Sequence, residues 1–185
     1  MAEFTNPYPL SPAESPLPLG ARYLFMSEGK EDIVKAIQFS YLQDLNTQPV
    51  YNLGFGDYNI ETDALVDTTN SNNGDHYRVL NTVLSTIPPF LETYPNAVLM
   101  VHGSDGRPDF EANCKATCTK NCIMECKNFK RRINIYRRYL DKNYDELNAD
   151  YQFKGGVFQQ NGDIYLEDYI PRKIYDAVLL SKRNV

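Results

Sequence analysis

The sequence has no apolar run that approaches the roughly 18–20 residues needed to span a bilayer as a helix. Its first residues also lack a basic segment followed by an apolar one, which is the pattern of a secretory signal. We therefore expect a soluble protein of the cytoplasm with no membrane partner.

The motifs of several common enzyme classes are missing as well. There is no G-x-S-x-G, no P-loop, no H-E-x-x-H and no clustered carboxylate pair. Ser-hydrolase, NTPase and metallopeptidase chemistry therefore have no support in the sequence. Of the two histidines, His102 lies at the predicted carboxyl end of a strand, where active sites of open α/β sheets gather. Whether the protein is an enzyme stays open at this stage.

Positive charge is scarce overall and unevenly distributed. The formal net charge of −5 argues against a general nucleic-acid binder, because binding phosphates requires a basic face. Residues 115–142, however, contain nine of the nineteen Lys and Arg residues against two acidic residues, so this segment is +7 and the remainder is −12. We do not expect nucleic-acid binding except through this basic segment, residues 115–142.

The 185 residues suffice for one domain with a substantial core. Residues 1–20 contain five of the eleven prolines, each of which fixes φ and removes a hydrogen-bond donor. We predict a Pro-rich flexible arm over residues 1–20, mobile or only loosely docked, with a proline-rich docking motif as the alternative. A single domain is expected over residues 21–185.

Alternation and helical spacing predict an α+β domain. Four strands are expected first, at Tyr23–Phe25, Ile33–Phe39, Tyr51–Asp57 and Ile60–Thr68. A helix follows from about His76 to Leu91, with Asn73 or Asp75 as its N-cap. A kink or break is expected near Ile87, because Pro88 and Pro89 cannot continue a helix interior.

The second half is predicted to continue with the buried strand Ala97–Val101 and a long helix from about Asp109 to about Asn143. Aromatic-rich strands close the chain, with a hairpin turn at Asn161-Gly162-Asp163. The predicted fold is thus a largely antiparallel sheet with two main helices in the order β-β-β-β-α-β-α-β-β.

Four cysteines recur at C-x₃-C-x₃-C-x₃-C spacing, namely Cys114, Cys118, Cys122 and Cys126. On one continuous helix the first and last would be roughly 18 Å apart along the axis, whereas thiolates that share one zinc ion each lie about 2.3 Å from it. We expect free, reduced cysteines and no shared metal, in a helical insertion at about residues 105–130. Pairs that complete a site with a second chain, and regulatory oxidation, remain open.

A series of motifs resembles a family of small bacterial proteins of unknown function. The most specific are NLGFGD at 52–57, NNGD at 72–75, and Gly103-Ser104 followed by Arg132-x-x-x-Tyr136. The resemblance runs from about Tyr23 to Lys182, and the cysteine-bearing stretch departs from it. It implies no established activity.

The predicted order of elements also has a distant likeness to GNAT-type acyltransferases. In those proteins a helix N-terminus holds the pyrophosphate of coenzyme A, and a Tyr on the second helix protonates the thiolate, so the likeness implies coenzyme A as a cofactor. The Gly-rich turn expected there is replaced by residues 70–75, and Asp75 would repel a pyrophosphate. The likeness is one of fold only.

The candidate site follows from this arrangement. If the basic helix packs back across the strand end, a hydroxyl, a guanidinium and a phenol converge where the first helix points its amides. Such a pocket suits an anion, because a guanidinium pairs with phosphate or carboxylate in bidentate geometry. The predicted catalytic groups are Ser104 and Tyr136, and the predicted ligand-binding groups are Asn73, Gly74, Gly103 and Arg132.

Two functional classes remain open. One is a small enzyme or binding domain for an anionic, nucleotide-like ligand, including an acyltransferase-like enzyme. The other is a non-catalytic interaction protein, such as a toxin–antitoxin or defence-locus component, that uses the +7 segment and the aromatic-rich C-terminal sheet as its contact surface.

Overall fold

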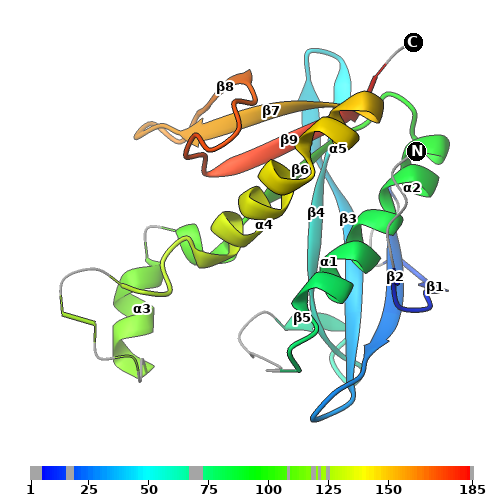
Figure 1. Ribbon diagram of the computed structural model, residues 1–185, viewed down its shortest axis with the longest axis vertical. Coiled ribbons are helices and arrows are strands. Elements are labelled where there is room, and N and C mark those ends of the chain that lie inside the picture. The colour runs from blue at the N-terminus through cyan, green and yellow to red at the C-terminus, as the bar shows by residue number, and fades with distance from the viewer. Residues whose placement is uncertain are drawn as a thin grey trace. The chain divides into compact units, whose positions relative to one another are not determined.

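A computed structural model describes residues 6–15, 19–66, 73–107, 109–117, 120, 122–123 and 126–183 (Figure 1). The chain forms two compact units, Met1–Leu99 and Met100–Val185. The fold class is α+β, and the strands within each unit pair antiparallel, as predicted. The division into an arm, one domain and an insertion stays a prediction.

The sheet of the first unit has the strand order β1-β2-β3-β4, and β5 pairs with β4. Its alternating side chains bury one row against the helices, because successive strand residues point to opposite faces. Phe39, for example, is paired with Leu53 in the neighbouring strand, and both are buried. The strands are β1 (Ser11–Ala13), β2 (Gly20–Ser27), β3 (Ile33–Leu45), β4 (Gln48–Asn59) and β5 (Ala64–Val66).

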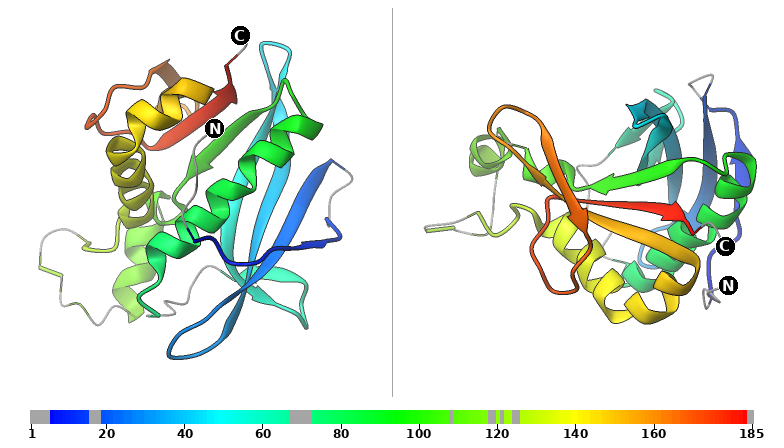
Figure 2. Two further views of the ribbon diagram at one scale, coloured as in Figure 1. Left: turned by 45° about the vertical axis from the view of Figure 1, so that its right-hand side comes forward. Right: turned by 90° about the horizontal axis from the view of Figure 1, so that it is seen from above.

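Helices α1 (His76–Ser85) and α2 (Ile87–Thr93) lie across strands β2 to β4 (Figure 2). The break between them at Thr86 confirms the interruption that was predicted near Ile87, since the following prolines occupy the first turn of α2. Phe90 of α2 stacks on Phe39 with ring centroids 4.0 Å apart, so α2 covers the centre of the sheet.

The described part of the predicted arm is docked to the first unit. Ser11–Ala13 forms β1, which pairs with β2, and the Tyr8 side chain is only 3% exposed. These residues are docked in the structure, and the flexibility of the arm stays a prediction. A single large side chain and three paired residues supply contacts that a count of prolines does not reveal.

The second unit contains the elements η1 (Ser104–Gly106), α3 (Phe110–Thr117), α4 (Arg131–Lys142), α5 (Tyr144–Asp150), β7 (Tyr151–Phe158), β8 (Ile164–Asp168) and β9 (Ala177–Lys182). Its strands have the order β9-β7-β8. The predicted hairpin turn joins β7 to β8, where the Gln159 amide donates to the Asp163 carbonyl at 2.8 Å. Strand β6 (Val98–His102) spans the boundary between the two units in sequence.

One continuous helix from Asp109 to Asn143 was predicted, and this prediction is wrong. Helix α3 ends at Thr117 and α4 begins at Arg131. Lys130 has φ 53°, in the left-handed region, which interrupts any α-helix for an L-residue. Apart from η1, the expected insertion at residues 105–130 is helical only in α3 among the residues that the structure describes. The GNAT-like order of elements is not confirmed.

No helix in the described ranges is both long and apolar enough to cross a membrane.

Candidate functional site

The second unit brings together two of the predicted site residues, Ser104 and Arg132. Ser104 is the first residue of η1 and is separated from the end of β6 by Gly103 alone, and Arg132 is the second residue of α4. The Arg132 Nη1 donates a hydrogen bond to the Ser104 Oγ. The cysteine-bearing stretch that separates them in sequence therefore does not keep them apart.

A buried aspartate that sequence analysis missed fixes this pair. Asp105 is 4% exposed, and its Oδ2 accepts a hydrogen bond from the Arg132 amide at 2.8 Å. Its backbone carbonyl accepts from the Lys130 amide at 3.1 Å. The first amides of a helix have no intrahelical acceptor, so Asp105 satisfies the start of α4 and fastens it to η1. The only signal in the sequence is an acidic residue directly after Ser104.

Gly103 has a spatial role beside the pair. A Cβ at this position would lie 2.5 Å from the Asp105 Oδ1 and 3.3 Å from the Arg132 Cβ. The first distance is shorter than real Cβ contacts, so a side chain here would displace the Asp105 carboxylate that binds the start of α4. Gly103 thus permits the close approach that lets Arg132 reach Ser104.

Tyr136 lies on the same helix one turn after Arg132, where residues four apart share a face. Its side chain is half-buried. His102, at the end of β6, faces Phe158 edge-on with ring centroids 6.4 Å apart. The catalytic role assigned to Tyr136 stays a prediction.

Asn73 and Gly74 belong to the first unit. The Asn73 Nδ2 donates to the Glu31 carbonyl at 2.8 Å and to the Ser27 Oγ at 3.1 Å, so this amide fixes the turn between β2 and β3. Gly74 has φ +73°, a backbone conformation that favours glycine. Both residues therefore shape the entry to α1, and their predicted ligand-binding role remains a prediction.

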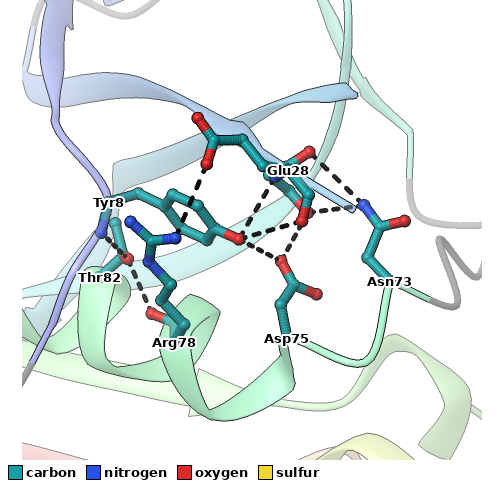
Figure 3. Close-up of polar contacts among 7 residues, drawn as sticks. Tyr8, Glu28, Asn73, Asp75, Arg78 and Thr82 are labelled. Atoms are coloured by element: carbon teal, nitrogen blue, oxygen red, sulfur yellow. Dashed lines mark hydrogen bonds and ion pairs between the residues drawn. The ribbon is translucent and has the colours of Figure 1, made fainter. Parts of the chain in front are cut away.

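Asp75 occupies the N-cap position of α1, but its carboxylate makes no capping hydrogen bond. The Oδ2 instead accepts from the Tyr8 hydroxyl at 2.9 Å and from the Ser27 Oγ at 2.6 Å (Figure 3). The expectation that Asn73 or Asp75 caps the helix through its side chain is therefore corrected. A carboxylate still lies at the start of α1, where the helix dipole favours negative charge.

Tyr8 packs into a slot of the first unit that sequence analysis did not foresee. The residues that contact Tyr8 there, which we call the Tyr8 slot, are Phe25, Glu28, Asp75, Arg78 and Thr82. The Tyr8 ring stacks on Phe25 with centroids 5.6 Å apart. The Arg78 guanidinium carbon lies 3.7 Å from the centroid of the Tyr8 ring, and Figure 3 shows Arg78 beside that ring. Burial, followed by the hydrogen bond to Asp75, raises the pKa of the Tyr8 phenol. An aromatic residue between two prolines was the available signal, and it does not specify what the ring contacts.

Three cations are buried in the described part of the chain, and each has a partner inside its own unit. Arg22 pairs with Asp63, and Lys35 pairs with Asp57. Arg137 of α4 donates to the Lys173 carbonyl. In the +7 segment, Lys130 also pairs with Asp176 at 2.6 Å. Two of the nine basic side chains of that segment, Lys130 and Arg137, are thus engaged within the second unit.

The structure describes three of the four cysteines, namely Cys114, Cys122 and Cys126. No group of three or more His, Cys, Asp or Glu side chains among the described residues could hold a metal ion, and the expected absence of a shared metal stays a prediction. Cys118 lies outside the described residues. Because the helix is broken, the argument from helical rise no longer bears on the cysteines.

Comparison with known proteins is informative at the level of the family alone. No curated protein and no solved structure matches the chain. The likeness to GNAT-type acyltransferases is therefore not confirmed. A family of unknown function, DUF6934, matches residues 6–108.

The matched range includes the Tyr8 slot, the NLGFGD and NNGD motifs, and Gly103-Ser104, and it ends before Arg132 and Tyr136. It covers more than half of the 185 residues and agrees with the resemblance drawn from the motifs. The chain belongs to this family of unknown function, DUF6934.

Proposed function

We propose that the protein binds a small anionic ligand through Ser104 and Arg132 in the second unit. The observation that supports this function best is the hydrogen bond from the Arg132 guanidinium to the Ser104 Oγ. A guanidinium carries five N–H donors, and a hydroxyl that accepts from it must direct its own hydrogen elsewhere. The pair can therefore donate a guanidinium N–H and a hydroxyl O–H to one oxyanion.

Asp105 and Gly103 support this proposal by holding the pair in place. The buried Asp105 carboxylate binds the Arg132 amide, and the missing Cβ of Gly103 allows the close contact of η1 with α4. Donors that are fixed before a ligand arrives lose less conformational entropy on binding. Carboxylates and phosphates, including nucleotide-like compounds, are the ligand classes that such donors select.

An enzymatic version assigns Ser104 and Tyr136 to catalysis. Tyr136 lies one helical turn from Arg132, so a ligand held by the guanidinium would lie within the same region of α4. Acyl transfer from coenzyme A is the specific reaction to test first, with Tyr136 as the proton donor. Coenzyme A accordingly belongs in the ligand screen, together with nucleotides, inorganic phosphate and simple carboxylates.

The experiment compares two neighbouring arginines. After a thermal-shift screen identifies a ligand, its affinity is measured by calorimetry for the unmodified protein, Arg132→Ala and Arg131→Ala, whose side chain is exposed. A ligand at 100 times its dissociation constant adds about 2.7 kcal/mol of stability, which the screen detects. Loss of a charged hydrogen bond should weaken binding in Arg132→Ala by about 1.5–3 kcal/mol. Equal affinity in both variants contradicts the assignment.

A non-catalytic interaction function is the second candidate, because large apolar side chains are exposed in the second unit. Phe158, Tyr165, Ile170 and Ile174 are 47%, 57%, 52% and 72% exposed. Exposed apolar and aromatic side chains are typical of contact surfaces. A toxin of a toxin–antitoxin or defence locus would arrest growth when expressed in bacteria, and the double variant Tyr165→Ser, Ile174→Ser would relieve the arrest. Unchanged growth on expression contradicts the toxin version.

A further inference from the structure

The Tyr8 slot contacts every part of a tyrosine side chain. Phe25 lies against one face of the ring at 5.6 Å and an interplanar angle of 22°, and the Arg78 guanidinium lies over it at 3.7 Å. At the far end, the hydroxyl donates to Asp75 at 2.9 Å and accepts from the Glu28 amide at 3.3 Å. The slot thus matches a phenol in shape, in π-contact and in both hydrogen-bonding directions.

The slot also forms a hydrogen bond with the backbone of the segment to which the tyrosine ring belongs. The Tyr8 amide donates to the Thr82 Oγ1 at 2.8 Å, and Thr82 is fully buried. That oxygen in turn donates to the Arg78 carbonyl at 2.8 Å, so its orientation is fixed by α1 (Figure 3). Neighbouring prolines at positions 7 and 9 keep such a segment extended, which lowers the entropy lost on docking.

Tyr8 is the anchor of the arm. Among residues 6–15 it is the one buried side chain, and the pairing of β1 with β2 adds backbone contacts over three residues. A segment held by one buried aromatic resembles a peptide ligand with a single hot spot, in which most of the binding energy resides in the anchor. Strand β1 lies at the end of the strand order, so its departure would leave the pairing of β2 with β3 and of β3 with β4 in place.

We propose that this slot is a recognition site for a tyrosine side chain on an extended, Pro-flanked segment, filled here by the chain's own arm and open to the arm of a second copy. A tethered arm acts at an effective concentration of the order of millimolar, so it outcompetes a free segment of equal affinity until that segment reaches a similar concentration. Exchange between copies is therefore expected at high protein concentration, where it links two chains. The proposal concerns the first unit and does not depend on ligand binding at Arg132.

The recognition step is tested with the full-length Tyr8→Ala protein, which keeps the slot and removes its occupant. A fluorescently labelled peptide of residues 6–13, NPYPLSPA, is titrated and followed by anisotropy. Saturable binding is expected, at least tenfold tighter to Tyr8→Ala than to the unmodified protein. The same peptide with Ala in place of Tyr, and a Tyr8→Ala protein that also carries Arg78→Ala, serve as matched controls and should each bind at least tenfold more weakly.

Two results would overturn the recognition site: absence of saturable binding at millimolar peptide, or equal binding of the Tyr and Ala peptides. If Tyr8→Ala does not fold alone, refolding is repeated with the two peptides present. Rescue by the Tyr peptide and not by the Ala peptide supports the site, and rescue by neither or by both contradicts it.

The second-copy step is tested by mixing two variants. Tyr8→Ala has an intact slot without an anchor, and Asp75→Ala has an intact anchor with a damaged slot. Native mass spectrometry of the concentrated mixture should show a mixed dimer that neither variant forms alone. A mixture that stays monomeric, under conditions in which the peptide binds, refutes the exchange between copies while leaving the recognition site in place.

Discussion

Each unit of the molecule contains a hydrogen bond from a buried tyrosine to an aspartate at one end of a helix. In the first unit the Tyr8 hydroxyl donates to Asp75 at 2.9 Å, at the start of α1. In the second, the Tyr169 hydroxyl donates to Asp141 at 2.8 Å, in the last turn of α4. Both hydrogen bonds join a tyrosine hydroxyl to an aspartate carboxylate. The aspartate lies at the N-terminal end of the helix in the first unit and at the C-terminal end in the second.

This difference should change what each aspartate contributes. The helix dipole favours a carboxylate at the N-terminus and disfavours one at the C-terminus by about 0.3–1 kcal/mol for exposed groups. Asp75 gains from this effect. The carboxylate of Asp141 lies at the unfavourable end of the dipole and is stabilised by two hydrogen-bond donors, the Tyr169 hydroxyl and the Arg172 amide at 3.0 Å. A tyrosine can thus attach its segment to either end of a helix through an aspartate. The free energy of unfolding lost when that aspartate is removed should depend on which helix end it occupies.

The largest expected effect is loss of either ring. Tyr8 and Tyr169 are 3% and 4% exposed, and each stacks on other aromatic rings, at 5.6 Å on Phe25 and at 5.7 Å on Tyr144. Replacing either tyrosine with Ala should lower the free energy of unfolding by about 3–5 kcal/mol, measured by urea denaturation. The exposed Tyr165→Ala is the control and should change it by no more than about 0.5 kcal/mol.

A small effect for Tyr8→Ala alone would break the comparison. It would mean that the arm adds little to the first unit and that the original expectation of a loosely docked segment describes the protein in solution better.

The next effect concerns the two aspartates. Asp75→Ala removes the acceptor of both Tyr8 and the fully buried Ser27 hydroxyl, so we expect a loss of about 2–3 kcal/mol in the free energy of unfolding. Asp141→Ala removes an acceptor from an unfavourable helix end and should cost about 1 kcal/mol. Asp75→Asn keeps an acceptor oxygen and serves as the control. Equal losses for the two alanine variants would show that the helix end has no influence.

Much of this architecture could be predicted from the sequence. The parts that could not be predicted depend on contacts between residues far apart in the chain. The strands and the break at Thr86 follow from local patterns, namely alternation and the position of Pro88 and Pro89. The prediction of one continuous helix to Asn143 is wrong because α3 ends at Thr117 and α4 begins at Arg131, directly after Lys130 in a left-handed conformation that its residue type does not predict. The amide of that residue is held by the Asp105 carbonyl, a contact between distant parts of the chain.

The same division applies to the candidate site. The pairing of Ser104 with Arg132 was expected from their places after a strand and on a basic helix. Asp105 and Tyr8 were missed, because their importance lies in long-range contacts with Arg132 and Asp75 and not in any local spacing. Local patterns therefore predicted which elements form, and contacts across the chain decided which polar groups are buried.

A smaller effect appears at high pH. Burial, followed by hydrogen bonding to Asp75 or Asp141, raises the pKa of both Tyr8 and Tyr169 above the usual value. A raised folded-state pKa gives stability that is complete below the unfolded pKa of about 10 and is lost as the pH rises beyond it. Stability should thus fall above pH 10, by at most about 1.4 kcal/mol per pH unit for each proton that unfolding releases. The Phe variants Tyr8→Phe and Tyr169→Phe should each flatten this slope, and an unchanged slope in either variant excludes that tyrosine as a contributor.

The smallest expected effect concerns the difference between the surroundings of the Tyr8 ring and those of the Tyr169 ring. Tyr8 has a guanidinium over its ring, whereas the ring of Tyr169 stacks on Tyr144. A cation–π contact at a partly exposed site contributes about 0.5–1 kcal/mol, and the Arg78 pair with Glu28 adds little because Glu28 is largely exposed. Arg78→Met keeps an apolar cover on the ring and removes the charge, so it should lower the free energy of unfolding by about 0.5–1 kcal/mol. Arg78→Lys keeps a cation and should recover part of that loss. If the methionine variant is as stable as the unmodified protein, Arg78 acts only by covering the ring, and the two tyrosines are then held in the same way, by packing and one hydrogen bond to an aspartate.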